Sequence, residues 1–287
     1  MDIIITGLLL GGTYALIALG LNLQYGVARI MNLANGEFLV LGALASFWIF
    51  VADAISPILT MVVVAPLSFF GNWVIYKLLM RPLVSRAKNQ GHLEVDSILA
   101  TFGMSFALVG IMVSIHGEYF TYSYLAEPFV ILGETFALNR IVAFCFAVLI
   151  GAILWFWLYF TRTGMAMRAV AVSTEASGLV GIDVPRMSAL AFALGGAVTT
   201  MGGTLISTFI TLDASVGVIF TMKALIIIIM GGVGDIRGAI LAAVILGLVE
   251  TFVARLIDPG LTLAAAYTIF VFILLLRPQG IFGRKQA

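Results

Sequence analysis

The sequence predicts an all-helical protein that crosses a membrane many times. Hydrophobic residues make up 62% of the chain and charged residues only 10%, whereas a soluble domain carries about 25% charge. The apolar runs approach or exceed the roughly 20 residues that a membrane-spanning helix needs. They lack the alternation typical of the strands of an outer-membrane barrel. We therefore expect an all-α integral membrane protein, a polytopic bundle of about eight to ten transmembrane helices.

Nine apolar segments are the candidates for these helices. They cover approximately residues 3–25, 38–52, 57–79, 97–115, 140–160, 188–210, 221–233, 239–256 and 262–276. No basic residue precedes the first segment and no cleavage site follows it, so we interpret it as a retained helix rather than a signal peptide. Several segments are short or broken. We expect all of them to form one transmembrane domain that covers residues 1–287.

The distribution of basic residues predicts which loops face the cytoplasm. With residues 1 and 2 outside, most Lys and Arg residues fall in the inner loops, and the outer loops are mainly acidic. The positive-inside rule then places the loop at 161–187 and the C-terminus in the cytoplasm. The connection at 116–139 becomes the longest external loop, rich in aromatic residues and glutamate. It forms either an aromatic belt at the membrane surface or a landing surface for an external protein.

Small residues at four-residue spacing indicate helices whose backbones approach closely. They are Gly7, Gly11 and Ala15 in the first segment, and Gly195, Thr199, Gly203 and Ser207 in the sixth. The same two segments share scattered identical residues at a constant spacing along the chain, such as Gly11-Gly12-Thr13 and Gly202-Gly203-Thr204. Because the predicted topology runs these segments in opposite directions, the matches leave an inverted repeat open, a plan common among transporters.

Two apolar regions are interrupted by glycine and polar residues, at 29–37 and at 231–238. Backbone groups freed by such a break cannot face lipid, so the break must be buried in protein or line a wet cavity. Paired interruptions of this kind point to a transport site. The alternative is an ordinary cytoplasmic turn in which Asn35 or Asp235 caps the next helix. The sequence does not distinguish the two interpretations.

Glu250 lies inside an apolar segment, about seven residues and on the order of 10 Å from the outer end. Arg255 is five residues further on and points to a different side of the helix, so it does not pair with Glu250. The carboxylate therefore needs a partner on another helix, water or a substrate. It is either a functional group or a structural hydrogen-bond acceptor. We expect Asn22 and Thr251 to join helices, and Lys223 to snorkel toward the surface.

A short helix is predicted at 174–181, within the basic cytoplasmic loop. Thr174 can cap free amides, Glu175 places negative charge in the first turn, and Gly181 supplies a left-handed end. A helix of about two turns is not stable alone in water. Its apolar face should therefore dock on this chain's own helices or on a partner. That face comprises Ala176, Leu179 and Val180.

The motifs of several enzyme classes are missing from the sequence. It contains no phosphate-binding loop of the form G-x-x-x-x-G-K-[ST], so the chain has no recognisable means of hydrolysing ATP. It also lacks H-E-x-x-H and G-x-S-x-G, and Cys145 is its one cysteine. We expect no catalytic residue, no cofactor, no metal and no nucleic-acid partner. Energy for any transport must come from another protein or from an ion gradient.

Motifs spread over nearly the whole chain resemble those of the permease subunits of ATP-binding-cassette importers for branched-chain amino acids. The matching stretches are 12–20 (GTYALIALG), 32–37 (NLANGE), Arg168-Ala169 with Glu175-Ala176, 181–184 (GIDV), 230–239 (MGGVGDIRGA) and 277–283 (RPQGIFG). Each is weak alone and together they are highly specific. The chain departs from the family pattern at Ser177, where alanine is usual, at Asn35, where histidine is frequent, and at Asp235 and Arg237, where Ser and Pro are frequent.

The resemblance implies a bacterial inner-membrane subunit that works with several partners in the lipid bilayer. These are cytoplasmic ATP-binding subunits, a second homologous permease subunit in a heterodimer, and an external substrate-binding protein. It further implies that the short helix docks into a groove of the ATPase and transmits its closure. The coupling residues would be Thr174, Glu175, Ala176, Ser177, Leu179, Val180 and Gly181.

The expected solutes are branched-chain or other neutral amino acids, with urea or short amides as the alternative within the same family. A self-sufficient secondary transporter or channel, in which Glu250 binds a proton or an ion, is the rival from another class. In either case we expect the path to be lined by intramembrane polar residues. The candidates are Asn22, Asn32, Asn35, Glu37, Glu250 and Thr251.

Overall fold

The computed structural model describes residues 2–53, 55–87, 89–117, 119–122, 124–131 and 133–283. In this part of the chain, eight helical spans are long and apolar enough to cross a membrane, and a ninth apolar helix is shorter. The eight are α1 (Asp2–Ala28), α2 (Asn35–Asp53), α3 (Pro57–Ile75) with its continuation, α5 (Gln90–His116), α6 (Leu138–Phe160), α9 (Val184–Ile206), α11 (Ile236–Leu256), and α12 (Thr262–Leu276) together with the short turn before it. The short one is α10 (Gly217–Gly231). Each predicted segment overlaps one of these helices, which confirms an all-α polytopic bundle.

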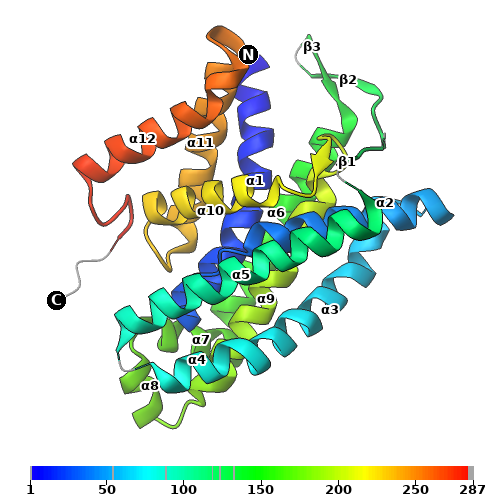
Figure 1. Ribbon diagram of the computed structural model, residues 1–287. Coiled ribbons are helices and arrows are strands. Elements are labelled where there is room, and N and C mark those ends of the chain that lie inside the picture. Colours follow the sequence, from blue (N-terminus) through cyan, green and yellow to red (C-terminus); the bar gives the residue numbers. More distant parts are fainter. Residues whose placement is uncertain are drawn as a thin grey trace.

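The remaining elements mark two opposite ends of the bundle. At one, β1 (Tyr119–Phe120) pairs with β4 (Leu212–Asp213), and β2 (Pro128–Ile131) forms a hairpin with β3 (Glu134–Ala137). We call this the hairpin end; it also holds the start of α1 (Figure 1). At the other, the loop end, lie α7 (Arg162–Val172) and α8 (Thr174–Leu179) (Figure 1). The connecting elements are η1 (Tyr76–Met80) and α4 (Arg81–Arg86), which continue α3, and η2 (Pro259–Leu261) before α12.

Helix α1 lies at the centre because glycine lets its neighbours come close. A Cβ added to Gly11 would lie 2.8 Å from the Cα of Val244 in α11, and one added to Gly7 would lie 2.9 Å from the Cα of Leu248. On another side, Gly20 faces Thr199 and Gly195 of α9. The predicted small-residue stripes are therefore packing seams.

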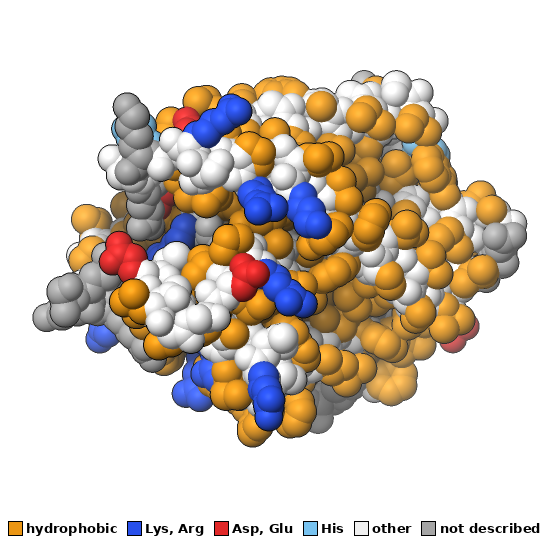
Figure 2. All heavy atoms as spheres, turned by 90° about the horizontal axis from the view of Figure 1, so that it is seen from below, with side chains coloured by type: hydrophobic (Ala, Val, Ile, Leu, Met, Phe, Trp, Pro, Cys, Tyr) orange, Lys and Arg blue, Asp and Glu red, His pale blue; other side chains and the backbone are white. Residues whose placement is uncertain are grey.

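The bundle has a buried centre and an apolar outer layer. Helices α1, α2 and α9 are mostly buried, whereas few residues of α3, α5, α6 and α12 are buried. Seen from the loop end, hydrophobic side chains cover the flanks and Lys and Arg side chains gather toward the middle (Figure 2). This distribution gives the bundle an apolar belt and a basic end, as the sequence predicts.

The structure does not support the alignment behind the inverted repeat. The spacing that matches Gly11 with Gly202 also matches Met31, in the break after α1, with Met222 inside α10. These two residues lie in different kinds of element, so the match does not continue beyond the glycine-rich parts of the two segments. The shared letters are therefore better explained by the Gly-rich composition of both segments.

The connection at 116–139 folds back onto the bundle. The Tyr122 hydroxyl hydrogen-bonds to Ser207 at 2.7 Å, and the Tyr124 hydroxyl to Ser56 at 2.8 Å. Burial raises the pKa of the Tyr122 phenol above its usual value. These two tyrosines thus tie the loop to α9 and to the start of α3. The hairpin β2–β3 remains exposed beyond them, where Val130 is 62% exposed.

Candidate functional site

The break after α1 is buried within the protein. The chain leaves α1 at Arg29, which has a positive φ of 56°, and α2 begins six residues later at Asn35. The side chains of Asn32, Asn35 and Glu37 are all 0% exposed. Asn32, not Asn35, accepts the nearby backbone amide, that of Ala34, at 3.0 Å. This break is therefore a buried polar feature and not an ordinary surface turn.

Amide side chains satisfy most of the polar groups of this break. Asn32 donates to the Oε1 of Gln24 at 2.9 Å, and Gln24 donates in turn to the carbonyl of Phe192 at 3.1 Å. Thr199 of α9 donates to the Oδ1 of Asn35 at 3.0 Å. The Nδ2 of Asn35 has no hydrogen-bond partner among the described residues. The break is thus held by α1 and α9 and keeps one free amide donor.

Glu37 lies where two helices begin. It is in the first turn of α2, and a Cβ added to Gly217, the first residue of α10, would lie 2.6 Å from its carboxyl carbon. Ser105 of α5 donates to the Oε1 of Glu37 at 2.9 Å, while Oε2 has no partner in the described part of the chain. Helix N-termini favour negative charge. The position therefore suits a carboxylate.

A second polar group joins three helices. Lys223 of α10 lies 2.8 Å from the Oε2 of Glu250 on α11 and donates to the hydroxyl of Tyr14 on α1 at 2.7 Å. That hydroxyl donates to the same Oε2 at 2.8 Å. We call these three residues the ionic triad. The prediction that Lys223 snorkels is wrong, because the lysine is held inside the bundle by its buried counter-ion.

The partner of Glu250 therefore lies on another helix, as predicted, and Arg255 pairs with Asp2 at 3.0 Å instead. Glu250 is 4% exposed, and its Oε1 has no hydrogen-bond partner in the described chain. The same is true of the hydroxyl of Thr251. Thr251 was expected to join helices, and no such bond is present.

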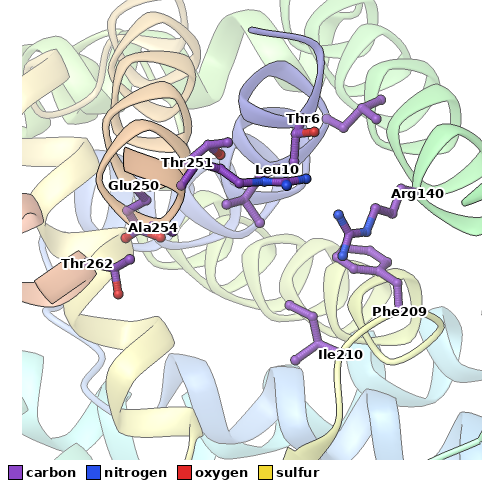
Figure 3. A pocket seen from close by; sticks show the side chains of 11 residues that line it. Thr6, Leu10, Arg140, Phe209, Ile210, Glu250, Thr251, Ala254 and Thr262 are labelled. Carbon is purple, nitrogen blue, oxygen red and sulfur yellow. The ribbon is translucent and has the colours of Figure 1, made fainter. Parts of the chain in front are cut away.

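Both free atoms belong to residues that line a cavity of about 420 Å³ near the hairpin end. Figure 3 shows Glu250 and Thr251 on one side of this cavity and Arg140 with Phe209 on the other. The remaining lining residues are Thr6, Leu9, Leu10, Ile210, Ala254, Arg255 and Thr262. The cavity thus combines acidic, basic, hydroxyl and apolar groups.

Helix α10 connects the buried break with the ionic triad. The hydroxyl of Thr221 accepts the amide of Gly36 at 2.7 Å and donates to the carbonyl of Leu33 at 3.2 Å. Lys223 follows two residues later on the same helix. Asn22, in contrast, belongs to neither group: its side chain bonds only to Gly234 and Asp235, at 2.8 and 3.2 Å.

The second interruption, at 231–238, is a capped turn at the loop end. Asp235 accepts the amide of Gly238 at 2.9 Å and so caps α11. This agrees with the predicted alternative of an ordinary turn in which Asp235 caps the next helix. The C-terminal segment covers this turn, since Ile281 donates its amide to the carbonyl of Met230 at 2.8 Å. The two interruptions therefore differ, and only the first is a buried polar break.

The short helix α8 protrudes at the loop end. Its N-cap is Ser173, whose hydroxyl accepts the amide of Ala176 at 3.2 Å, and not Thr174 as predicted. Both residues have a hydroxyl that can cap a helix. Because Ser173 is the cap, Thr174 is the first residue of the helix and not the residue before it. Gly181 has a φ of 82° and ends the helix as predicted. Glu175 lies in the first turn.

One side of α8 is buried and the other is open. Ser177 is buried and donates to the carbonyl of Ser173 at 2.7 Å. Leu179 is 90% exposed and Val180 is 76% exposed, and Ala176 is exposed as well. The predicted apolar face is therefore not docked on any described helix of this chain.

Several important residues were missed from the sequence. Gln24, Ser105 and Thr221 were not singled out, and Tyr14 was noted only as part of the stretch at 12–20, although each bonds to a predicted polar residue or to the buried break. They lie in apolar runs, and no local pattern marks the bonds they make. The only available signal was that a polar residue inside an apolar segment needs a partner on another helix.

Comparisons with known proteins agree with this architecture. The chain is 27% identical to the high-affinity branched-chain amino acid transport system permease protein LivH of Escherichia coli (strain K12), over 98% of this chain and 94% of that protein. It is 27% identical to the corresponding protein BraD of Pseudomonas aeruginosa, over 99% and 95% of the two chains.

Among solved structures, PsaBC from Streptococcus pneumoniae in complex with Fab aligns with a TM-score of 0.49 at 10% identity, covering 98% of this chain and 94% of that one. The pattern of the family described as branched-chain amino acid transport system / permease component matches residues 3–276. The chain is therefore a multi-pass membrane protein that belongs to this permease family.

Proposed function

We propose that this chain is the membrane-spanning subunit of an ATP-binding-cassette importer for branched-chain or other neutral amino acids. The observation that carries the proposal is the full-length similarity to LivH and BraD, which are named as branched-chain amino acid permeases. The chain contains no phosphate-binding loop. In this proposal, hydrolysis of ATP takes place on separate cytoplasmic subunits.

In this proposal α8 docks into the ATPase. Burial of an exposed leucine or valine side chain stabilises a complex by about 1.5–3 kcal/mol, and Leu179 and Val180 offer two such side chains at 90% and 76% exposure. Ser177 of α8 is buried, and the helix contacts α7 and α9 of the bundle. A docked α8 therefore carries force into the bundle instead of bending away.

A direct contact leads from this loop to the buried break. Arg29 donates from its Nη2 to the carbonyl of Ala171, near the end of α7, at 3.0 Å. Arg29 is also the first residue after α1. We propose that movement of α7 and α8 reaches the segment at 29–34 through this bond. The Asn32, Asn35 and Glu37 cluster would then change its arrangement when the ATPase closes.

The proposed path runs along α10, past the buried break and the ionic triad. Asn32, Asn35, Glu37, Glu250 and Thr251 remain its candidate lining residues. Four of the five, all except Asn32, have a buried side-chain atom without a hydrogen-bond partner in the described chain. For Asn22 we propose a structural role instead, because both its side-chain polar atoms are bonded to the turn at 234–235.

The proposed assembly contains a second, homologous permease subunit, two ATP-binding subunits and an external substrate-binding protein, in a bacterial inner membrane. The loop end and the C-terminus face the cytoplasm. This orientation is supported by the Lys and Arg side chains that gather at the loop end (Figure 2) and by the positive-inside rule.

Reconstitution into liposomes tests this function. The full chain is purified with its partner subunits and placed in vesicles so that its cytoplasmic side faces the interior. The vesicles are loaded with ATP, and uptake of radiolabelled leucine from outside is measured. We expect uptake to require ATP, the external binding protein and catalytically intact ATPase subunits, and to resist proton uncouplers. Leucine transport by this chain alone, driven by an ion gradient, would refute the proposal. A panel that includes urea and short amides identifies the solute class.

A further inference from the structure

The cavity beside Glu250 has the chemistry to hold a whole amino acid. We propose that it is a binding site for the zwitterionic head group and apolar side chain of a neutral amino acid, at the hairpin end of the path. The inference rests on the proposed function and deepens it, because it assigns the solute to named residues. Its three parts are a free acceptor, a free cation and an apolar wall.

The acceptor side is formed by Glu250 and Thr251. Lys223 and Tyr14 both bond to Oε2 of Glu250, which leaves Oε1 without a partner among the described residues. The hydroxyl of Thr251 is also unpartnered, and both side chains are more than nine-tenths buried. Buried polar atoms are nearly always hydrogen-bonded. Both residues line the cavity, so a donor bound there, such as an ammonium group, would supply the bonds that these two atoms lack.

The cation side is formed by Arg140, near the start of α6. Its guanidinium lies 6.0 Å from the ring centroid of Phe209, and it takes part in neither of the ion pairs found in the described chain. Arg255 also lines the cavity but already pairs with Asp2. Arg140 is therefore the group that is free to bind a carboxylate, which guanidinium matches with two parallel hydrogen bonds.

The position of these groups fits one small zwitterion. Figure 3 shows Arg140 facing the cavity from the side opposite Glu250 and Thr251, with Leu10 between them. A volume of about 420 Å³ lies within the roughly 300–1,000 Å³ range of small-molecule sites. Leucine and isoleucine residues of the lining, such as Leu10 and Ile210, suit an aliphatic side chain.

Direct binding to the assembled transporter tests the site. The transporter is purified without its external binding protein, placed in phosphatidylglycerol nanodiscs, and titrated with radiolabelled L-leucine. The matched variants are Arg140→Gln in the cavity and Arg86→Gln, which changes an exposed arginine at the loop end. Both positions are exposed, so neither substitution disturbs the core. Thr251→Val tests the acceptor side.

We expect Arg140→Gln to weaken leucine binding roughly tenfold or more, because it removes a hydrogen bond to a charged group. Arg86→Gln should bind like the wild type. Leucinamide, which lacks the carboxylate, should bind weakly and equally to the wild type and to Arg140→Gln. Thr251→Val should weaken both ligands. This pattern assigns the carboxylate to Arg140 and the ammonium to the acceptor side.

Equal leucine affinity in Arg140→Gln and Arg86→Gln would overturn the site, as would wild-type binding of leucinamide as tight as that of leucine. Phosphatidylethanolamine carries the same two charges, so a parallel measurement uses discs of that lipid. Lipid retained by the wild type but not by Arg140→Gln, together with no leucine binding, would show a lipid head-group site and overturn the assignment. If the site fails while ATP-driven leucine uptake persists, the proposed function still stands.

Discussion

Replacement of Lys223 by methionine should destabilise the bundle more than any surface substitution. Glu250 is 4% exposed and has two donors, Lys223 and Tyr14, both at 2.8 Å from its Oε2. Methionine fills similar space but removes the ammonium, and the carboxylate keeps only the hydroxyl of Tyr14. Removal of one partner from a buried ion pair costs about 3–5 kcal/mol. We expect the free energy of unfolding to fall by this amount.

A double-mutant cycle separates the ion pair from the packing of each side chain. Glu250→Gln alone leaves a lysine that is 12% exposed without its counter-ion, whereas Lys223→Met with Glu250→Gln leaves no unpaired charge. The double variant should therefore cost less than the sum of the two single variants, by about 1–3 kcal/mol. Unfolding of the full chain in mixed micelles measures each value.

Arg86→Met is the matched control, since it removes an exposed cation from α4. Its effect should remain within about 0.5 kcal/mol. Additive single effects, or a cost for Lys223→Met no larger than that of the control, would refute the reasoning. Such a result would mean that the triad is not an energetic unit in the folded chain.

Three further substitutions probe the other features. Leu179→Ser on α8 should change stability by less than about 0.5 kcal/mol yet abolish transport-coupled ATP hydrolysis; normal hydrolysis would contradict docking through this face. Gly181→Pro should leave the subunit folded but also abolish stimulated hydrolysis, because proline cannot adopt the φ of 82° found there; unchanged stimulation would exclude a coupling role for α8. Gly36→Ala should cost about 1–3 kcal/mol in an unfolding assay, because its Cβ would lie 2.6 Å from the backbone carbonyl carbon of Gly217; a neutral effect would show that the two helix starts are not tightly packed.

The helices, the break between two of them and the end of α8 could be predicted because their sequence signals are local. Long apolar runs, the break at 29–37 and the glycine at 181 can each be recognised within a few residues. The same limit explains the error at the start of α8. Ser173 and Thr174 are adjacent hydroxyl residues, and the sequence does not show which one leaves the helix.

The partners inside the bundle could not be predicted, because they depend on which helices meet. Glu250 clearly needed a partner, but Lys223 is 27 residues away and Tyr14 is 236 residues away along the chain. Near the end of a segment, lysine more commonly extends toward the surface. Only the packing of α10 against α1 and α11 places it beside a buried carboxylate.

The starts of α10 and α2 lie together at one buried carboxyl group, that of Glu37. With 15 residues, α10 is about 22 Å long, less than the roughly 30 Å of the hydrocarbon layer. It therefore begins within the bundle, at Gly217, where the packing places the carboxylate of Glu37 in contact with its first residue. Glu37 also lies in the first turn of α2. The side chain of Glu37 thus lies at two helix N-termini, whose partial positive charge lowers the cost of burying its carboxyl group without a lysine or arginine partner in the described chain.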